Sequence, residues 1–196
     1  KPLDPNDVGH FLYLLDTLKN TTTKAFLYTV WNTGLRSNSL RQLRWSWIDK
    51  RDSAINIPKE YVKTRTPFKC PLTPIALSMI ESLKGIDKTY VFLGNNNKPI
   101  SDRTPRVAYQ KLLASSIPDG ENMTIHGFRT TLNLVTTRSK KFSTEVIESQ
   151  LTHAYAQQIR RVYLGNLDYF DERKELLNWY EEWGAKEKQT FIENNR

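Results

Sequence analysis

Apolar residues recur at helical spacing over most of this chain. Near its start, Asp4 and Pro5 have the residue types of a helix N-cap and first turn. The apolar residues that follow at helical spacing are Val8, Phe11, Leu12, Leu15 and Leu18. A second apolar stripe covers residues 26–31 and stops at Gly34, a residue suited to a left-handed helix end. Just beyond it, we expect Ser37 to cap a short third helix.

The pattern changes to that of β-strands between residues 53 and 72. Apolar and polar residues alternate over Ile55–Ile57, and residues 61–62 and 68–72 continue this strand character. The last two segments surround a basic tip, Lys-Thr-Arg at residues 63–65. This stretch predicts a small antiparallel sheet in which a hairpin presents basic side chains.

Helical patterns return in the rest of the chain. One helix is expected to start at Thr73-Pro74, and another to be capped by Ser101 or Asp102 and to end near Ser116. Further helices are expected at residues 126–139, 143–151 with Ser143 as the cap, 155–164 and 168–188. Residues 90–93 should be extended, and residues 94–99 should form a loop. The predicted fold class is mainly α with a small antiparallel β-sheet (α+β).

Composition is that of an ordinary globular protein. The chain has 196 residues, of which 38% are hydrophobic, and this indicates one domain or one domain with a small appendage. No apolar run approaches the roughly 20 residues that a membrane-spanning helix needs. The single Cys70 excludes an internal disulfide framework and suits a reducing compartment.

The formal charge of +8 at pH 7 is spread unevenly along the chain. Residues 1–163 carry 24 Lys and Arg against 13 Asp and Glu, whereas residues 164–196 carry 5 against 8. A basic body is typical of a protein that binds a polyanion. The acidic C-terminal tail argues against binding to a membrane surface and favours docking onto a basic partner.

Three stretches supply side chains suited to phosphoryl chemistry. Residues 33–36 read Thr-Gly-Leu-Arg, residues 126–129 read His-Gly-Phe-Arg, and residues 150–164 hold His153 and Tyr163. Cutting a DNA strand without a metal requires a nucleophile such as a phenol, positive charge at the non-bridging oxygens and a proton for the leaving oxygen. Arginine binds phosphate with two parallel hydrogen bonds, and a lysine can act as the general acid. The histidines have no Cys or carboxylate at ligand spacing, and no Gly-x-x-x-x-Gly-Lys loop occurs, so we expect no cofactor.

The order Arg, His-x-x-Arg, His and Tyr resembles the catalytic domain of the tyrosine recombinase (phage integrase) family over almost the whole chain. It is most similar to the prophage and genomic-island integrases, in which an acidic, aromatic helix follows the nucleophile. The resemblance implies the recombinase catalytic-domain fold. The catalytic residues that it implies are Arg36, Lys63, His126, Arg129, His153 and the nucleophile Tyr163.

Within this resemblance, the distance from His153 along the sequence identifies which tyrosine matches the family's nucleophile. Tyr163 lies ten positions after His153, which fits the family. Tyr155 is too close to His153, and Tyr169 is too far from it. A threonine, Thr152, stands before His153 where the family often has glycine.

The lysine and the first arginine have their own local patterns. Lys63 matches the family's lysine on the hairpin that follows the first arginine, and its competitors nearby are Lys59, Arg65 and Lys69. Ser39 stands three positions after Arg36, where the family usually has an acidic residue.

The resemblance implies an enzyme that integrates or excises a mobile element by cleaving and rejoining DNA through a 3′-phosphotyrosyl intermediate. Its expected partners are double-stranded DNA attachment sites, other integrase protomers in a synaptic tetramer, and accessory DNA-bending or directionality factors. The expected location is the cytoplasm of a bacterial host. Residues 1–163 would form the catalytic domain up to the nucleophile and residues 164–196 its acidic helical tail. We expect N-terminal DNA-binding domains to be absent from this stretch of a longer integrase.

Two other readings stay open, a type IB topoisomerase and a non-catalytic DNA-binding module of the same fold. The Thr-Gly-Leu-Arg and Leu-Thr-His forms favour the recombinase over the topoisomerase. A non-catalytic module would have lost the nucleophile or an arginine, and both are present. In the tail, Leu176, Tyr180 and Trp183 share one helix face, which must be buried either against its own domain or against a neighbouring protomer.

Overall fold

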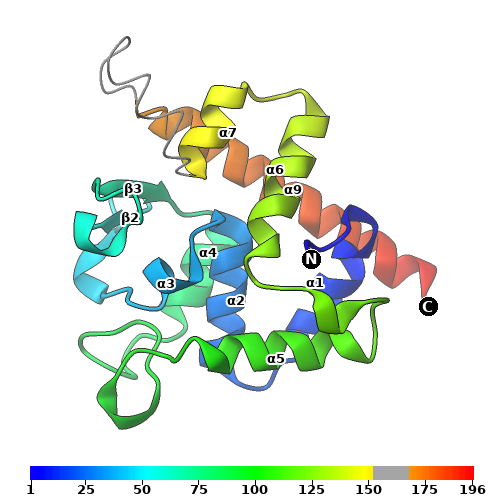
Figure 1. The fold of residues 1–196 in the computed structure, drawn as a ribbon, viewed down its shortest axis with the longest axis horizontal. Coiled ribbons are helices and arrows are strands. Elements are labelled where there is room, and N and C mark those ends of the chain that lie inside the picture. Colours follow the sequence, from blue (N-terminus) through cyan, green and yellow to red (C-terminus); the bar gives the residue numbers. More distant parts are fainter. Residues whose placement is uncertain (152–167) are drawn as a thin grey trace.

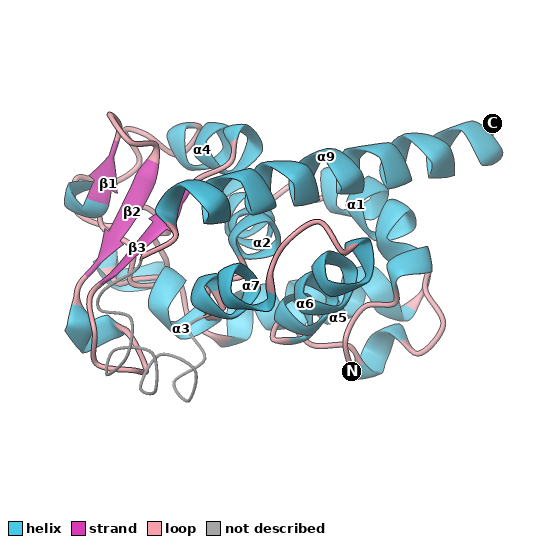
Figure 2. Cartoon of the chain, turned by 90° about the horizontal axis from the view of Figure 1, so that it is seen from above, coloured by secondary structure: helices cyan, strands magenta, loops and turns pink. Residues whose placement is uncertain are grey.

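The computed structural model describes residues 1–151 and 168–196. Within these ranges, helices make up most of the fold, and a sheet of three strands lies beside them (Figure 1). The strands lie at one end of the molecule, and the last helix runs along its side toward the other end (Figure 2). The predicted fold class, mainly α with a small antiparallel sheet, is confirmed.

Within the described residues, the helices begin and end close to the residues that the sequence predicted. The helix expected at residues 155–164 lies outside the described residues. The α-helices are α1 (Val8–Asp16), α2 (Thr21–Thr33), α3 (Ser37–Leu40), α4 (Pro74–Glu81), α5 (Arg103–Ala114), α6 (Gly127–Ser139), α7 (Thr144–Gln150) and α9 (Phe170–Asn194). Short 3-10 turns are η1 (Pro5–Asp7), η2 (Trp45–Trp47), η3 (Lys59–Tyr61), η4 (Asn95–Asn97) and η5 (Gly120–Asn122). The tail helix α9 extends beyond the predicted end at residue 188.

Side chains cap several of these helices as predicted. Asp4, Thr73 and Ser143 each accept a hydrogen bond from a main-chain N–H group of the turn that follows. Asp102 holds the N-cap position of α5 without a capping bond, and the Oγ of Ser101, the residue before it, accepts a bond of 3.1 Å from the N–H of Thr104.

The prediction for the start of α3 is wrong. Arg36 holds the extended N-cap conformation (φ −68°, ψ 133°), and Ser37 is already the first helical residue. No side-chain hydrogen bond caps this end of α3. Arg36 therefore lies directly at the junction between α2 and α3.

The sheet has the order β1-β2-β3, with both pairs antiparallel. Its strands are β1 (Ile48–Asp49), β2 (Ala54–Ile57) and β3 (Phe68–Pro71). Ile55 and Ile57 of β2 are buried, whereas Asn56 between them is exposed, as the alternating pattern predicted. Strand β1 adds a strand that the sequence pattern did not reveal.

The prediction of a strand at residues 61–62 is wrong. Pro58 is followed by the 3-10 turn η3, in which the N–H of Val62 bonds to the carbonyl of Lys59. A proline cannot donate to a strand ladder, and here it marks the end of β2. The basic segment at residues 63–65 therefore follows a turn on one side and leads into β3 on the other.

The aromatic core surrounds Trp31 of α2. The centroid of the Trp31 ring lies 5.5 Å from that of Phe11, 5.4 Å from that of Phe128 and 4.9 Å from that of Tyr180. These rings belong to α1, α6 and α9, so α2 is the central helix against which the others pack. Because rings at these separations interact favourably beyond their buried area, this cluster fixes the helices to one another.

The tail helix α9 packs against its own domain. Leu176, Leu177 and Tyr180 are fully buried, and Trp183 is half-buried against the same core. Where α1 meets α9, a Cβ added at Gly9 would lie 2.3 Å from the carbonyl oxygen of Glu187, so only glycine permits this approach. The apolar stripe of the tail is therefore buried against its own domain, which was one of the two alternatives that the sequence left open.

Candidate active site

Arg129 lies at the centre of the candidate site, in the first turn of α6. Its side chain is only 6% exposed. Its guanidinium donates one hydrogen bond to the carbonyl of Gly34 and another to the carbonyl of Leu151. These carbonyls lie at the C-terminal ends of α2 and α7, where the helix dipole favours a cation. The guanidinium carries more N–H donors than these two bonds use, so it can also bind a phosphate.

Arg36 contributes a second positive charge beside Arg129. Arg36 is half-buried, and burial lowers its pKa. Burial, and then the nearby charge of Arg36, lower the pKa of Arg129 to about 10. Arg129 therefore remains protonated at neutral pH. The two cations repel each other, and an anion that bound to both would relieve that repulsion.

The pKa of His126 is affected by the charges of three other predicted residues. It holds the N-cap position of α6, with its side chain exposed. Partial burial lowers its pKa, and the charges of Arg129, Arg36 and Lys63 lower it further, in that order. These charges come from α6, from the α2–α3 junction and from the segment before β3. Arg36, Lys63 and Arg129 therefore lie near enough to His126 for their charges to act on it.

The beginning of the chain holds the start of α6 in place. A Cβ added at Gly127 would lie 2.5 Å from the carbonyl oxygen of Lys1 and 2.7 Å from the Cα of Pro2. Beyond this contact, the hydroxyl of Thr131 donates a hydrogen bond of 2.7 Å to the carbonyl of Leu3. Close backbone packing therefore requires glycine at this position of the segment, between His126 and Arg129.

Lys63 and its competitors differ in their contacts. Lys63 is exposed on the segment between η3 and β3. Lys69 forms ion pairs with Asp49 and Asp52, and its hydrogen bond to Asp52 raises its pKa most. A lysine held by two carboxylates gives up its proton less readily, so Lys69 is the poorer general acid.

The predicted residues His153 and Tyr163 lie outside the described residues, as does Tyr155. The described chain stops at Leu151, whose carbonyl Arg129 binds, and resumes at Asp168. Tyr169, the other tyrosine weighed as a nucleophile, is described and holds the N-cap position of α9 with φ 50°.

Gln150 and Arg173 belong to the same region, and the sequence analysis did not single them out. Both side chains are buried, and the Nη1 of Arg173 lies 3.3 Å from the Oε1 of Gln150. The Nε2 of Gln150 donates a bond of 2.6 Å to the carbonyl of Thr33, the residue before Gly34. An arginine on the apolar face of an otherwise acidic helix was the available signal for Arg173.

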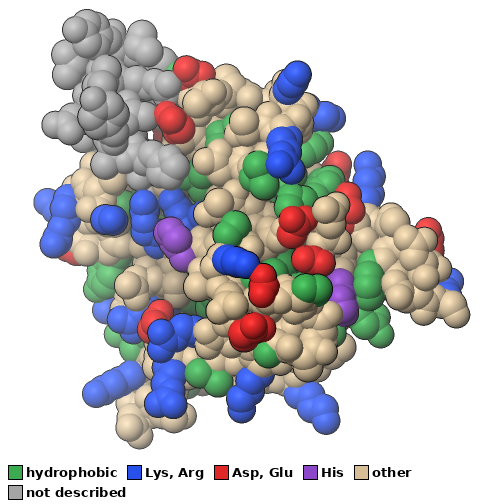
Figure 3. Space-filling model, turned by 45° about the vertical axis from the view of Figure 1, so that its right-hand side comes forward, with side chains coloured by type: hydrophobic (Ala, Val, Ile, Leu, Met, Phe, Trp, Pro, Cys, Tyr) green, Lys and Arg blue, Asp and Glu red, His purple; other side chains and the backbone are tan. Residues whose placement is uncertain are grey.

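Basic side chains are prominent on one face of the molecule. In Figure 3, Lys and Arg side chains gather on the left of the face that is shown. Among residues 1–151 and 168–196, no group of three or more His, Cys, Asp and Glu residues is placed to hold a metal ion. No helix in the described ranges combines the length and apolar character needed to cross a membrane.

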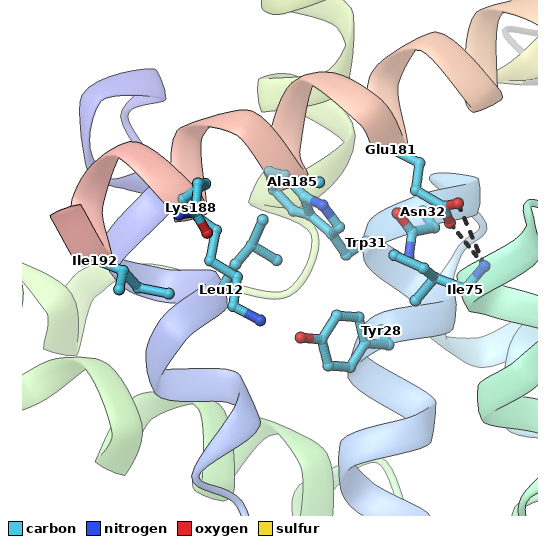
Figure 4. A pocket seen from close by; sticks show the side chains of 10 residues that line it. Leu12, Tyr28, Trp31, Asn32, Ile75, Glu181, Ala185, Lys188 and Ile192 are labelled. Carbon is cyan, nitrogen blue, oxygen red and sulfur yellow. Dashed lines mark hydrogen bonds between the residues drawn. The ribbon is translucent and has the colours of Figure 1, made fainter.

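A separate hollow lies where α9 crosses α1, α2 and α4 (Figure 4). None of the four described catalytic candidates lines it. Glu181 of α9 points at the start of α4, where its carboxylate oxygens lie 3.1 and 3.3 Å from the N–H nitrogen of Ile75 (Figure 4). A carboxylate at this end of a helix is favourable, so Glu181 helps to fix α9 on the domain.

Comparison with known sequences places these observations in a family. The model of the phage integrase family matches residues 1–168. The prophage integrase IntZ of Escherichia coli is 32% identical over 151 residues, which are 76% of this chain and 36% of that protein. The integrase of Enterobacteria phage P4 is 27% identical over 176 residues, covering 82% of this chain and 39% of that protein. The chain therefore spans less than half the length of these curated relatives.

Solved structures share the fold at low sequence identity. The integrase from mycobacterium phage Brujita has a TM-score of 0.68 and 12% identity, covering 91% of this chain and 58% of that one. The Tn1549 transposon integrase in complex with transposon right end DNA has a TM-score of 0.64 and 15% identity, covering 83% of this chain and 61% of that one. Together with the match of the family model to residues 1–168, this agreement shows that the chain belongs to the phage integrase family of tyrosine recombinases.

Proposed function

We propose that this chain is the catalytic domain of a site-specific DNA recombinase that cleaves and rejoins strands through a 3′-phosphotyrosyl intermediate. The observation that supports this proposal is that Arg36, Arg129 and Lys63 all lie near enough to His126 for their charges to lower its pKa. Such a cluster offers positive charge and hydrogen-bond donors to one phosphate. In this arrangement Tyr163 would supply the nucleophile and His153 a further hydrogen bond.

The chemical step exchanges one phosphodiester for another. The phenolic oxygen of Tyr163 bonds to phosphorus, and the bond from phosphorus to the 5′-oxygen breaks. Arg36 and Arg129 stabilise the negative charge on the non-bridging oxygens, which is the largest single contribution in many enzymes. Lys63 protonates the departing 5′-oxygen, and His126 accepts or relays the phenolic proton. Because the bond energy is kept in the phosphotyrosyl bond, rejoining needs no ATP.

The proposal also covers the domain division, the substrates, the partners and the place of action. Residues 1–163 would be the catalytic domain, and residues 164–196 its tail. DNA attachment sites would be the substrates, and other protomers in a synaptic tetramer and accessory DNA-bending or directionality factors would be the partners. The place of action would be the cytoplasm of a bacterial host. The curated prophage and phage integrases, and the transposon integrase bound to DNA, support this direction.

The test does not require the DNA sequence that the protein prefers to be known beforehand. The protein is incubated with a pool of nicked duplexes that have a randomised centre, and covalent adducts are recovered from a denaturing gel. We expect adducts that are enriched for one sequence and that form in the presence of a chelator. Strict dependence on a divalent metal, or binding with no adduct from the pool, would contradict the proposal. Relaxation of any supercoiled plasmid without sequence preference would point to a topoisomerase instead.

A further inference from the structure

A fully buried arginine of the tail helix lies beneath the candidate active site. Arg173 of α9 is 0% exposed. Its Nε donates to the carbonyl of Asp168 at 3.0 Å, and its Nη1 donates to the carbonyl of Lys69 at 2.9 Å. Its Nη1 also donates to the Oε1 of Gln150 at 3.3 Å, and its Nη2 binds the carboxylate of Asp168. One guanidinium thus joins α9 to β3 and to the end of α7.

Gln150 continues this set of bonds toward the catalytic arginines. Its side chain is 1% exposed, and its Nε2 donates to the carbonyl of Thr33 at 2.6 Å. The next residue on each of these two segments accepts from Arg129, because Leu151 and Gly34 provide the carbonyls that Arg129 binds. The ends of α2 and α7 are therefore joined twice, once by the amide of Gln150 and once by the guanidinium of Arg129.

The physical chemistry of such a cluster favours one arrangement. A guanidinium taken out of water is costly unless its donors are all bonded, and a buried network of this kind holds its members in a single geometry. Phe68 adds to this restraint, since its ring centroid lies 4.9 Å from the Cζ of Arg173. The carbonyls of Thr33 and Gly34 belong to consecutive peptide groups, so a shift of one displaces the other. Arg36 follows two residues later.

We propose that Arg173, acting through Gln150, is a positioning residue that holds Arg129 and Arg36 in register for the scissile phosphate. The proposal rests on the recombinase function inferred above. It makes the tail helix part of the catalytic apparatus without any contact between Arg173 and DNA. A misplacement of about 1 Å by a distant substitution can slow a reaction by about a hundredfold, so loss of this register should be visible in the rate.

Two conservative variants and one matched control separate positioning from stability. Arg173→Lys keeps the charge but loses the planar set of donors that reaches three segments. Gln150→Glu keeps an acceptor for Arg173 but loses the N–H donor that binds Thr33. Leu177→Ala removes a fully buried side chain from the same helix and serves as the control for simple destabilisation. All three are studied below their melting temperatures, which circular dichroism gives.

The first readout is cleavage of the nicked duplex that the wild-type protein selects from the randomised pool. At saturating protein, we expect Arg173→Lys and Gln150→Glu to form the covalent adduct about 10- to 100-fold more slowly than wild type. Their affinities for the same duplex should stay within about threefold of wild type, because phosphate contacts dominate binding. Leu177→Ala should cleave at close to the wild-type rate. Equal slowing by all three variants would overturn the positioning role.

The second readout does not depend on cleavage. The imidazole of His126 is titrated by NMR in each protein, since Arg129 and Arg36 both influence it. We expect the pKa of His126 to move toward the ordinary histidine value in the two positioning variants and to stay at the wild-type value in Leu177→Ala. An unchanged His126 titration would overturn the inference even if the wild-type protein forms no adduct, whereas absence of that adduct alone counts against the proposed function.

Discussion

The Oγ of Ser39 lies 2.6 Å from the carbonyl oxygen of Tyr61 and donates a hydrogen bond to it. Ser39 belongs to the short helix α3, which begins directly after Arg36. Tyr61 ends the turn η3, two residues before Lys63. A single side chain therefore ties the segment that carries the first arginine to the segment that carries the lysine. A serine hydroxyl can donate this bond, whereas an ionised carboxylate, the group that the family usually has at this position, can only accept hydrogen bonds.

Substitution of this serine should loosen both segments. We expect Ser39→Ala to lower the free energy of unfolding by about 0.5–1.5 kcal/mol, the usual net contribution of one hydrogen bond. It should also slow adduct formation by several fold. Ser82→Ala is the matched control, because Ser82 makes a bond of 2.7 Å to Met79 within its own turn. Chemical denaturation and the cleavage rate measure the two effects, and equal cleavage by both variants would contradict the connection.

Replacement of Arg129 by lysine should damage both the fold and the reaction. A lysine keeps the charge but cannot bind the carbonyls of Gly34 and Leu151 and a phosphate at the same time. We expect a loss of about 1–3 kcal/mol of stability from the carbonyls left unpaired. Cleavage should fall by about a hundred- to a thousandfold, as when one oxyanion donor is lost. Arg138→Lys, at the exposed end of the same helix, should change neither quantity, and a similar loss there would refute the assignment.

Lys63 can be tested as the general acid by changing the leaving group. Lys63→Met should slow cleavage of ordinary DNA because the departing 5′-oxygen then lacks a proton donor. A substrate with sulfur in place of that oxygen should restore the rate, since a thiol has a pKa near 8.5 and leaves without protonation. Lys69→Met is the comparison, because Lys69 is paired with Asp49 and Asp52. If the sulfur substrate rescues Lys69→Met and not Lys63→Met, the two roles are reversed.

The pKa of His126 predicts how acid acts on stability. This pKa lies below the ordinary value of 6.5, so the folded state binds the proton less tightly than the unfolded chain does. Above both the folded and the unfolded pKa, His126 is neutral in both states and does not affect stability. As the pH falls through the unfolded pKa of about 6.5, the unfolded chain binds the proton first, and this lowers the free energy of unfolding. The free energy of unfolding should therefore drop from about pH 7.5 to about pH 5.5, and it should drop less in His126→Gln. An equal drop in both proteins would exclude His126 as a cause.

Much of the fold could be predicted from local patterns. The helices follow apolar stripes and capping residues, and the left-handed Gly34 ends α2 as expected (φ 62°). The errors occurred where local preference does not decide the outcome. Strand β1 is only two residues long, and its pairing with β2 depends on tertiary packing. At residues 61–62 a turn after Pro58 replaced a strand that composition favoured.

The sequence indicated candidate site residues only where they belonged to a recognisable motif. The short motifs indicated Arg36, His126 and Arg129, and the hairpin indicated Lys63 among nearby basic residues. The bonds that hold these residues could not be predicted, because they join positions far apart in sequence. Arg129 meets Gly34 across 95 positions, and Arg173 meets the carbonyl of Lys69 across 104. No local pattern encodes contacts of this kind.

The most direct test of the proposed chemistry is the identity of the residue that becomes joined to DNA. Covalent adduct from a nicked duplex is digested with protease and nuclease, and mass spectrometry locates the modified peptide. The phosphodiester is expected on Tyr163, and Tyr163→Phe should bind the duplex with nearly wild-type affinity yet form no adduct. A modification mapped to Tyr155 or Tyr169, or an adduct that persists in Tyr163→Phe, would contradict the assignment of Tyr163 as the nucleophile.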